Sequence, residues 1–182
     1  MTATHSFFHE SGPVSVLFHP NTVPIVDIFR CISSFDDQYD LALLNGPEQV
    51  LMGLTRPEAA KAIISDALLL AFALDRQRSQ PLQHGPMNSR RGSMDEYCLM
   101  ALIGSARMPD SELAFEAASV LGVASLDLMT SLASDLIRQI DNGGLMFTTP
   151  SVSEFRGVVG ERVLFEDDLG EVLGRSELRF RF

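Results

Sequence analysis

Hydrophobic and polar positions across residues 55–144 repeat with the period of amphipathic helices. Thr55-Arg56-Pro57-Glu58 fits a capping box, with Pro in the first turn, and predicts a helix over residues 55–77. Between Ile63 and Leu74 only Ser65 and Asp66 are polar. A helix that is apolar on nearly all sides belongs inside a fold, so we expect this helix to be the spine of the core, with Leu69 buried.

The segment 93–144 predicts three successive helices joined by short turns. Ser93-Met94-Asp95-Glu96 is a second capping box. A second helix follows Ser111 and ends at Gly122, which is well placed as the residue after a helix. Ser125 begins the third helix, and Asn142-Gly143-Gly144 ends it.

The two ends of the chain have patterns that predict β-structure as well as helix, unlike the helical middle. In residues 13–54 we expect a short β-type run over 13–18, a helix from about residue 22 to residue 32, and a β-hairpin with its turn at Gly46-Pro47. In residues 157–182, glycines interrupt short apolar runs, and the last six residues alternate between apolar and polar. This pattern predicts a β tail.

Together these elements predict an α+β fold in a single domain over residues 1–182, with a flexible start at 1–12. Its centre is a mainly helical core of about five helices, with short antiparallel strands from the N-terminal third and the C-terminal tail. The chain has 182 residues, of which 46% are hydrophobic and 21% are charged. A chain of this size and composition can bury most of its apolar surface, so it needs no metal ion or disulfide bond for stability.

The net charge of the chain limits the classes of molecule that it can bind. The 14 basic and 24 acidic residues give a net charge of −10, distributed as −5 over residues 1–54, +2 over 55–108 and −7 over 109–182. Such a field repels phosphate, so nucleic acid is an unfavourable partner. Two isolated cysteines, Cys31 and Cys98, favour a reducing, cytoplasmic location, and no apolar run is long enough to cross a membrane.

No catalytic constellation is recognisable. The sequence has no G-x-S-x-G, no P-loop and no G-x-G-x-x-G. The acidic run over residues 36–40 is interpreted as a solvated turn. We therefore predict no catalytic residue, no metal ligand and no cofactor, and favour a protein that is not an enzyme.

An arginine cluster flanks the long loop expected over residues 78–92. Arginine binds carboxylate and phosphate groups through two parallel hydrogen bonds. The free N–H groups at a helix N-terminus also favour anions. The cluster either solvates the loop or forms an anion site. The candidate ligand-binding residues are Arg76, Arg78, His84, Arg90, Arg91 and Ser93.

An apolar stripe runs along the helix that begins after Ser125, at helical spacing: Met129, Leu132, Leu136 and Ile140. It belongs either to the core or to a face for self-association, since helices of paired monomers meet along such stripes.

We therefore expect a non-enzymatic, acidic interaction protein (an adaptor, chaperone-like or regulatory protein) that forms a homodimer and binds a basic or amphipathic segment of a partner protein. The alternative is a small-molecule anion-binding protein or enzyme that uses residues 76–93. A third reading is a helix-turn-helix DNA-binding regulator over residues 117–133, although the first turns of its second helix lack residues that read bases.

Overall fold

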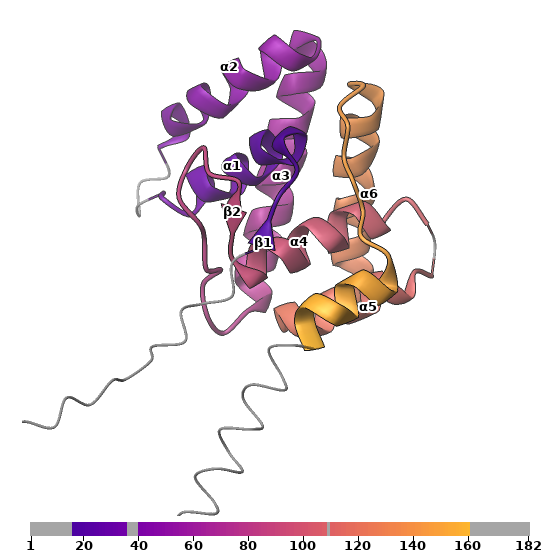
Figure 1. Ribbon diagram of the computed structural model, residues 1–182. Helices are drawn as coiled ribbons and strands as arrows, with labels where there is room; N and C mark the ends of the chain where they lie inside the picture. Colours follow the sequence, from indigo (N-terminus) through magenta and orange to yellow (C-terminus); the bar gives the residue numbers. More distant parts are fainter. Residues whose placement is uncertain (1–15, 36–39, 109, 161–182) are drawn as a thin grey trace, which may run out of the picture.

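The computed structural model describes residues 16–35, 40–108 and 110–160 (Figure 1). This part of the chain is mostly helical and contains one two-stranded antiparallel sheet, which agrees with a broad α+β class. The described helices exceed the expected five: there are six α-helices, two short 3-10 helices and a further helical segment over residues 152–160. The expected start at 1–12 and most of the acidic run at 36–40 lie outside the described residues.

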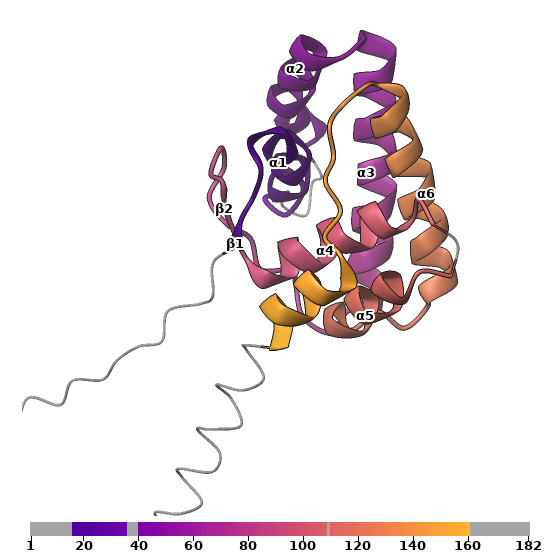
Figure 2. The ribbon, with the colours of Figure 1, turned by 45° about the vertical axis from the view of Figure 1, so that its right-hand side comes forward.

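The most deeply buried helix is α4 (Met94–Ser105), not the helix expected to be the spine. Ten of its 12 residues are buried, and Figure 2 shows it running across α3 and α6. Its start is the predicted capping box: the Ser93 hydroxyl accepts from the Glu96 N–H, and the Glu96 carboxylate accepts from the Ser93 N–H. A helix surrounded by others must be apolar all round, and α4 meets that condition after its first turn.

Helix α3 (Pro57–Gln77) ends where the sequence predicts but differs in its start and its exposure. Thr55 does not cap it. Its N–H closes the preceding helix, and its hydroxyl donates to the Gly143 carbonyl at 2.7 Å. Leu69 is 54% exposed whereas Leu70 is fully buried. The expectation that α3 is apolar and buried on all sides was therefore wrong, because its apolar residues outnumber its buried positions.

The hairpin expected around Gly46-Pro47 is also wrong, because this stretch is helical. A 3-10 helix, η2 (Leu41–Leu44), leads directly into α2 (Asn45–Leu54). Pro47 is the third residue of α2, where a backbone N–H has no intrahelical acceptor, so its missing N–H costs little. Spacing of three and four residues brings Leu44, Pro47 and Leu51 to the buried side.

The N-terminal β run pairs with the far end of the 78–92 segment. Strand β1 (Val16–Leu17) is antiparallel to β2 (Arg91–Gly92), with Val16 opposite Gly92. After the 3-10 helix η1 (Pro20–Thr22), helix α1 (Val23–Ile32) begins with Pro24 in its first turn, as predicted. Of the expected β tail, residues 157–160 are helical, and residues 161–182 lie outside the described part.

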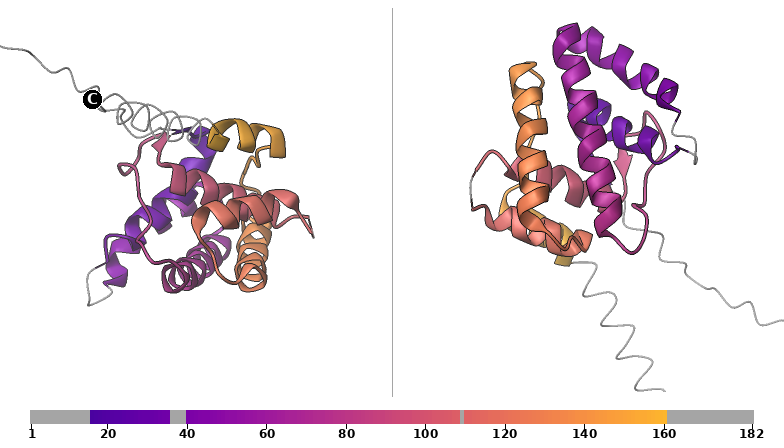
Figure 3. Two further views of the ribbon diagram at one scale, coloured as in Figure 1. Left: turned by 90° about the horizontal axis from the view of Figure 1, so that it is seen from below. Right: turned by 180° about the vertical axis from the view of Figure 1, so that it is seen from behind.

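Helices α5 (Glu112–Leu121) and α6 (Leu126–Asn142) confirm the predicted end of the helical segment. Gly122 ends α5 with φ 70°, a left-handed conformation that glycine adopts without steric cost. The view from behind shows α3 and α6 side by side (Figure 3). Residues 145–160 then return along α6, and Phe155 stacks on Tyr97 of α4 with ring centroids 5.7 Å apart.

The neighbours Leu69 and Leu70 of α3 give a matched test of this packing. We expect Leu70→Ala to lower the free energy of unfolding by about 2–5 kcal/mol, because it opens a cavity in the core. Leu69→Ala should change it by less than about 0.5 kcal/mol, because that side chain already meets water. Urea unfolding of both variants measures the two values, and equal losses would refute the placement of α3.

Candidate functional site

A buried arginine anchors the loop of residues 78–92 (hereafter the loop) to the helical core. The side chain of Arg30 in α1 is 1% exposed, and so is that of Glu96 in α4. The Arg30 guanidinium donates from Nε to Glu96 Oε1 at 2.7 Å and from Nη2 to Glu96 Oε2 at 3.0 Å. Its Nη1 donates to Asp27 Oδ1, one turn earlier on α1, at 3.1 Å. The ion cluster Asp27–Arg30–Glu96 therefore joins α1 to α4.

The same cluster binds the backbone of the loop. Arg30 Nη1 donates to the Ser89 carbonyl at 2.8 Å, and Nη2 donates to the Arg91 carbonyl at 2.9 Å. In return, the Gly85 N–H donates to Glu96 Oε1 at 3.0 Å, and the Asn88 N–H donates to Asp27 Oδ1 at 3.1 Å. All five N–H groups of the guanidinium therefore have acceptors. The cluster holds the loop and leaves no donor of Arg30 for a ligand.

The protonation of Glu96 follows from these contacts. Burial alone raises the pKa of a carboxyl group, but the nearby His84 ring, the Arg30 guanidinium and the N–H groups of Ser93 and Gly85 lower the pKa of Glu96 to about 2. For Asp27 the balance is opposite: burial raises its pKa despite the bonds from Arg30 and Asn88. Glu96 is therefore the stronger ionic partner of Arg30.

Gly92 lets the loop approach the cluster closely. A Cβ at this position would lie 2.0 Å from the Phe18 ring and 2.8 Å from Glu96 Oε2. Only glycine, which has no side chain, fits between the Phe18 ring and the Glu96 carboxylate.

The structure does not gather the six predicted ligand-binding residues into one site. Arg78 donates to Asp95 Oδ2 at 2.9 Å and to the Leu121 carbonyl, and Arg90 donates from Nε to the Phe18 carbonyl at 2.9 Å. Ser93 is the cap of α4, whereas Arg76 and Arg91 are exposed. Arg78, Arg90 and Ser93 thus serve to hold the loop and its flanks.

The stripe considered as a self-association face is part of the core. Met129, Leu136 and Ile140 are fully buried within the chain, and Leu132 packs partly buried against the same core. Of the two readings of the stripe, this burial favours the core, because the folded chain already covers these side chains.

The ion cluster of Asp27, Arg30 and Glu96 was not predicted from the sequence. A signal was present in α1, where Asp27 and Arg30 are the only charged residues of a ten-residue apolar helix. Charges three residues apart share a helix face, so both must be buried together or face water together. Glu96, the residue that pairs with Arg30, was assigned only a capping role, because its sequence position explains that role alone.

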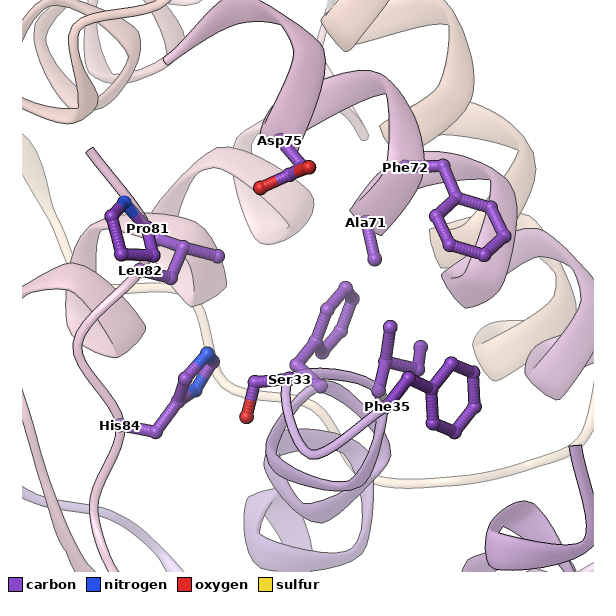
Figure 4. A pocket seen from close by; sticks show the side chains of 10 residues that line it. Ser33, Phe35, Ala71, Phe72, Asp75, Pro81, Leu82 and His84 are labelled. Atoms are coloured by element: carbon purple, nitrogen blue, oxygen red, sulfur yellow. The ribbon is translucent and has the colours of Figure 1, made fainter. Parts of the chain in front are cut away.

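A cavity of about 470 Å³ lies beside the cluster, between the end of α1, the last turns of α3 and residues 81–84 of the loop (Figure 4). Its apolar walls come from Phe29, Ile32, Phe35, Ala71, Phe72, Pro81 and Leu82, and its polar side chains are Ser33, Asp75 and His84. Of the predicted site residues, only His84 lines it. In Figure 4 the rings of Phe35 and Phe72 lie at one end, and Asp75 and His84 lie toward the other.

A second feature is the apolar surface of η2–α2, defined by five side chains. Helix α2 lies at the edge of the molecule with no described element over its outer side (Figures 1 and 2). The exposed fractions are between 37% and 55% for Leu41, Leu43, Val50, Met52 and Leu54. Val50 also lines a hollow of about 230 Å³ with Pro24, Pro47 and Met87, which joins this surface to α1 and the loop.

Comparison with known proteins gives no relative: no family model, no curated protein and no solved structure matches the chain. Within the described ranges, no group of three or more His, Cys, Asp or Glu side chains could hold a metal ion. No single helix of this part is long and apolar enough to cross a membrane, and one bent pair, α5 with α6, passes that test only by combined length and composition.

The ion cluster predicts a pH-dependent loss of stability. The pKa of Glu96 is about 2 in the folded chain and near 4.5 without these contacts. Its contribution to stability is therefore complete above pH 4.5, disappears as the pH falls toward 2, and amounts to about 3 kcal/mol at neutral pH.

We expect Glu96→Gln to lower the free energy of unfolding by about that amount at pH 7, with a smaller difference from the unsubstituted protein at pH 3. Chemical unfolding at both pH values measures the difference. Glu58→Gln, an exposed carboxyl in the first turn of α3, is the control and should show no such trend. A deficit of Glu96→Gln that stays constant with pH would contradict the role of the ionised carboxylate.

Proposed function

We propose that this chain is a non-enzymatic interaction protein that binds a basic, amphipathic segment of a partner protein on the apolar surface of η2–α2. The observation that carries the proposal is the exposure of Leu41, Leu43, Val50, Met52 and Leu54 on one short helical run. Val50 and Leu54, one helical turn apart, share a side of α2, and exposed apolar side chains grouped in this way are typical of protein interaction sites. Of the run, Leu44, Pro47 and Leu51 are buried, so most of its apolar side chains remain partly open to a partner.

Charge around this surface favours a basic partner. From Cys31 to Thr55 the sequence contains no lysine or arginine and four acidic residues. Asp40 and Glu48 belong to the helical run itself or its cap. A segment with apolar residues on one face and lysine or arginine beside them would bury its apolar face on η2–α2 and meet these carboxylates at the rim.

The two other functions considered from the sequence receive less support. An anion site in the loop would need arginine donors that the structure uses elsewhere, as for Arg78 and Arg90. Helices α5 and α6 bend by 111°, an angle suited to a helix-turn-helix motif. However, the one basic side chain of α6, Arg138, pairs with Asp135 at 2.6 Å, while Asp127 and Asp141 add negative charge. Such a helix would be repelled by phosphate.

The proposal is tested with the full chain and two synthetic 18-residue amphipathic peptides, one of Leu and Lys and one of Leu and Glu. We expect the Leu/Lys peptide to bind, more weakly as salt concentration rises, and the Leu/Glu peptide not to bind. The double variant Val50→Ser/Leu54→Ser should weaken binding at least about tenfold, because it removes two apolar contacts that lie one helical turn apart. Titration calorimetry measures the affinities.

Leu128→Ser is the matched control, because Leu128 is a 48% exposed apolar residue on α6. It should leave the affinity unchanged. Binding that survives Val50→Ser/Leu54→Ser, or that falls equally with Leu128→Ser, would overturn the assignment of the docking surface to η2–α2.

A further inference from the structure

The cavity beside the ion cluster has polar side chains that present hydrogen-bond acceptors. The Ser33 hydroxyl donates its single proton to the Arg30 carbonyl at 2.7 Å, so its oxygen can only accept from a ligand. The Asp75 carboxylate is acceptor-only when ionised, and it has no hydrogen-bond partner among the described side chains and backbone groups.

The neutral form of His84 adds a third acceptor. Its Nδ1 lies 3.4 Å from Glu96 Oε1, and its side chain is 14% exposed. A lone pair on Nδ1 would face a carboxylate, so the proton of the neutral ring belongs on this nitrogen. Nε2 then carries the lone pair, and the ring reaches from the loop toward the cavity, on the side where Asp75 also lies (Figure 4).

The helices around the cavity favour positive charge for a separate reason. Ile32 and Ser33 form the C-terminal end of α1, and Phe72 and Asp75 lie in the last two turns of α3. The C-terminal turns of both helices, where the helix dipole is negative, therefore lie beside the cavity. An anion placed there would meet these ends and the Asp75 carboxylate without a charged donor from the lining.

We infer that this cavity binds a small organic ammonium cation with an apolar body. The ammonium group donates hydrogen bonds to Asp75 and His84, and the apolar body packs against Phe35 and Phe72 at the other end of the cavity. A cavity volume of about 470 Å³ lies within the range of small-molecule sites, and seven of its ten lining residues are apolar. The site is separate from the surface of η2–α2, so it does not depend on the proposed function.

The test uses the full chain and three probes that share one apolar body and differ in the head group: 4-phenylbutylammonium, 4-phenylbutan-1-ol and 4-phenylbutyrate. We expect the ammonium to bind most tightly, the alcohol at least about tenfold more weakly, and the carboxylate not at all. Titrations followed by amide NMR should shift the signals of Phe72, Asp75, Leu82 and His84 and leave those of η2–α2 in place.

Asp75→Asn keeps the shape of the side chain and removes its charge. This variant should weaken the ammonium at least about tenfold and leave the alcohol unchanged. Glu58→Gln removes one charge at the opposite end of the same helix and should change neither affinity. Asp75 and Glu58 are both exposed, so both variants should keep the thermal unfolding midpoint of the unsubstituted chain.

Equal affinity for the ammonium and the carboxylate would overturn the inference. So would an unchanged affinity in Asp75→Asn, or shifts confined to residues outside the cavity. Failure of the Leu/Lys peptide to bind would refute only the proposed function, because its surface shares no side chain with this cavity.

Discussion

A guanidinium that is removed from water must have an acceptor for each of its five N–H groups, and the arrangement around Arg30 meets this constraint. Two carboxylates and two loop carbonyls satisfy it. These acceptors come from α1, α4 and the loop, and Glu96, the most distant in sequence, is 66 residues from Arg30. Leaving a buried charge unpaired is strongly unfavourable, so the loop cannot leave α1 and α4 without exposing or orphaning Arg30.

The loop in turn shapes the surface of the protein. Because Gly85 and Asn88 are held by Glu96 and Asp27, residues 81–84 lie over the ends of α1 and α3 and close one wall of the cavity. The other side of the loop places Met87 beside Val50 of α2. A single ion cluster therefore supports both proposed sites: the cavity on one side and the edge of the η2–α2 surface on the other.

Local signals in the sequence predicted much of the helical architecture, because capping residues and glycine act within one turn of chain. Ser93, Gly122 and Ser125 mark ends that the structure confirms. Tertiary context decided the elements that were missed. Thr55 has the right spacing for a cap, yet its hydroxyl bonds to Gly143, and nothing near it in sequence indicates that partner.

The residues of the proposed sites were harder to predict than the fold. The arginines near the loop were considered as one anion site because they are close in sequence. In the structure, Arg78 and Arg90 each donate to a different distant carbonyl. The apolar pattern of a segment does not show which of its residues are covered, and only packing decides that Leu136 is buried and Val50 exposed. Asp75 and Ser33 face one cavity because two helices end there, which no spacing along the chain reveals.

Amide hydrogen exchange of the loop tests the central role of Arg30 most directly. In the unsubstituted chain, the Gly85 and Asn88 amides should exchange slowly, because they donate to the buried Glu96 and Asp27 carboxylates. In Arg30→Lys, which keeps the charge but loses the planar fork, these two amides should lose protection while those in the middle of α6 keep theirs. Fast exchange of Gly85 and Asn88 in the unsubstituted chain, or unchanged protection in Arg30→Lys, would contradict the account.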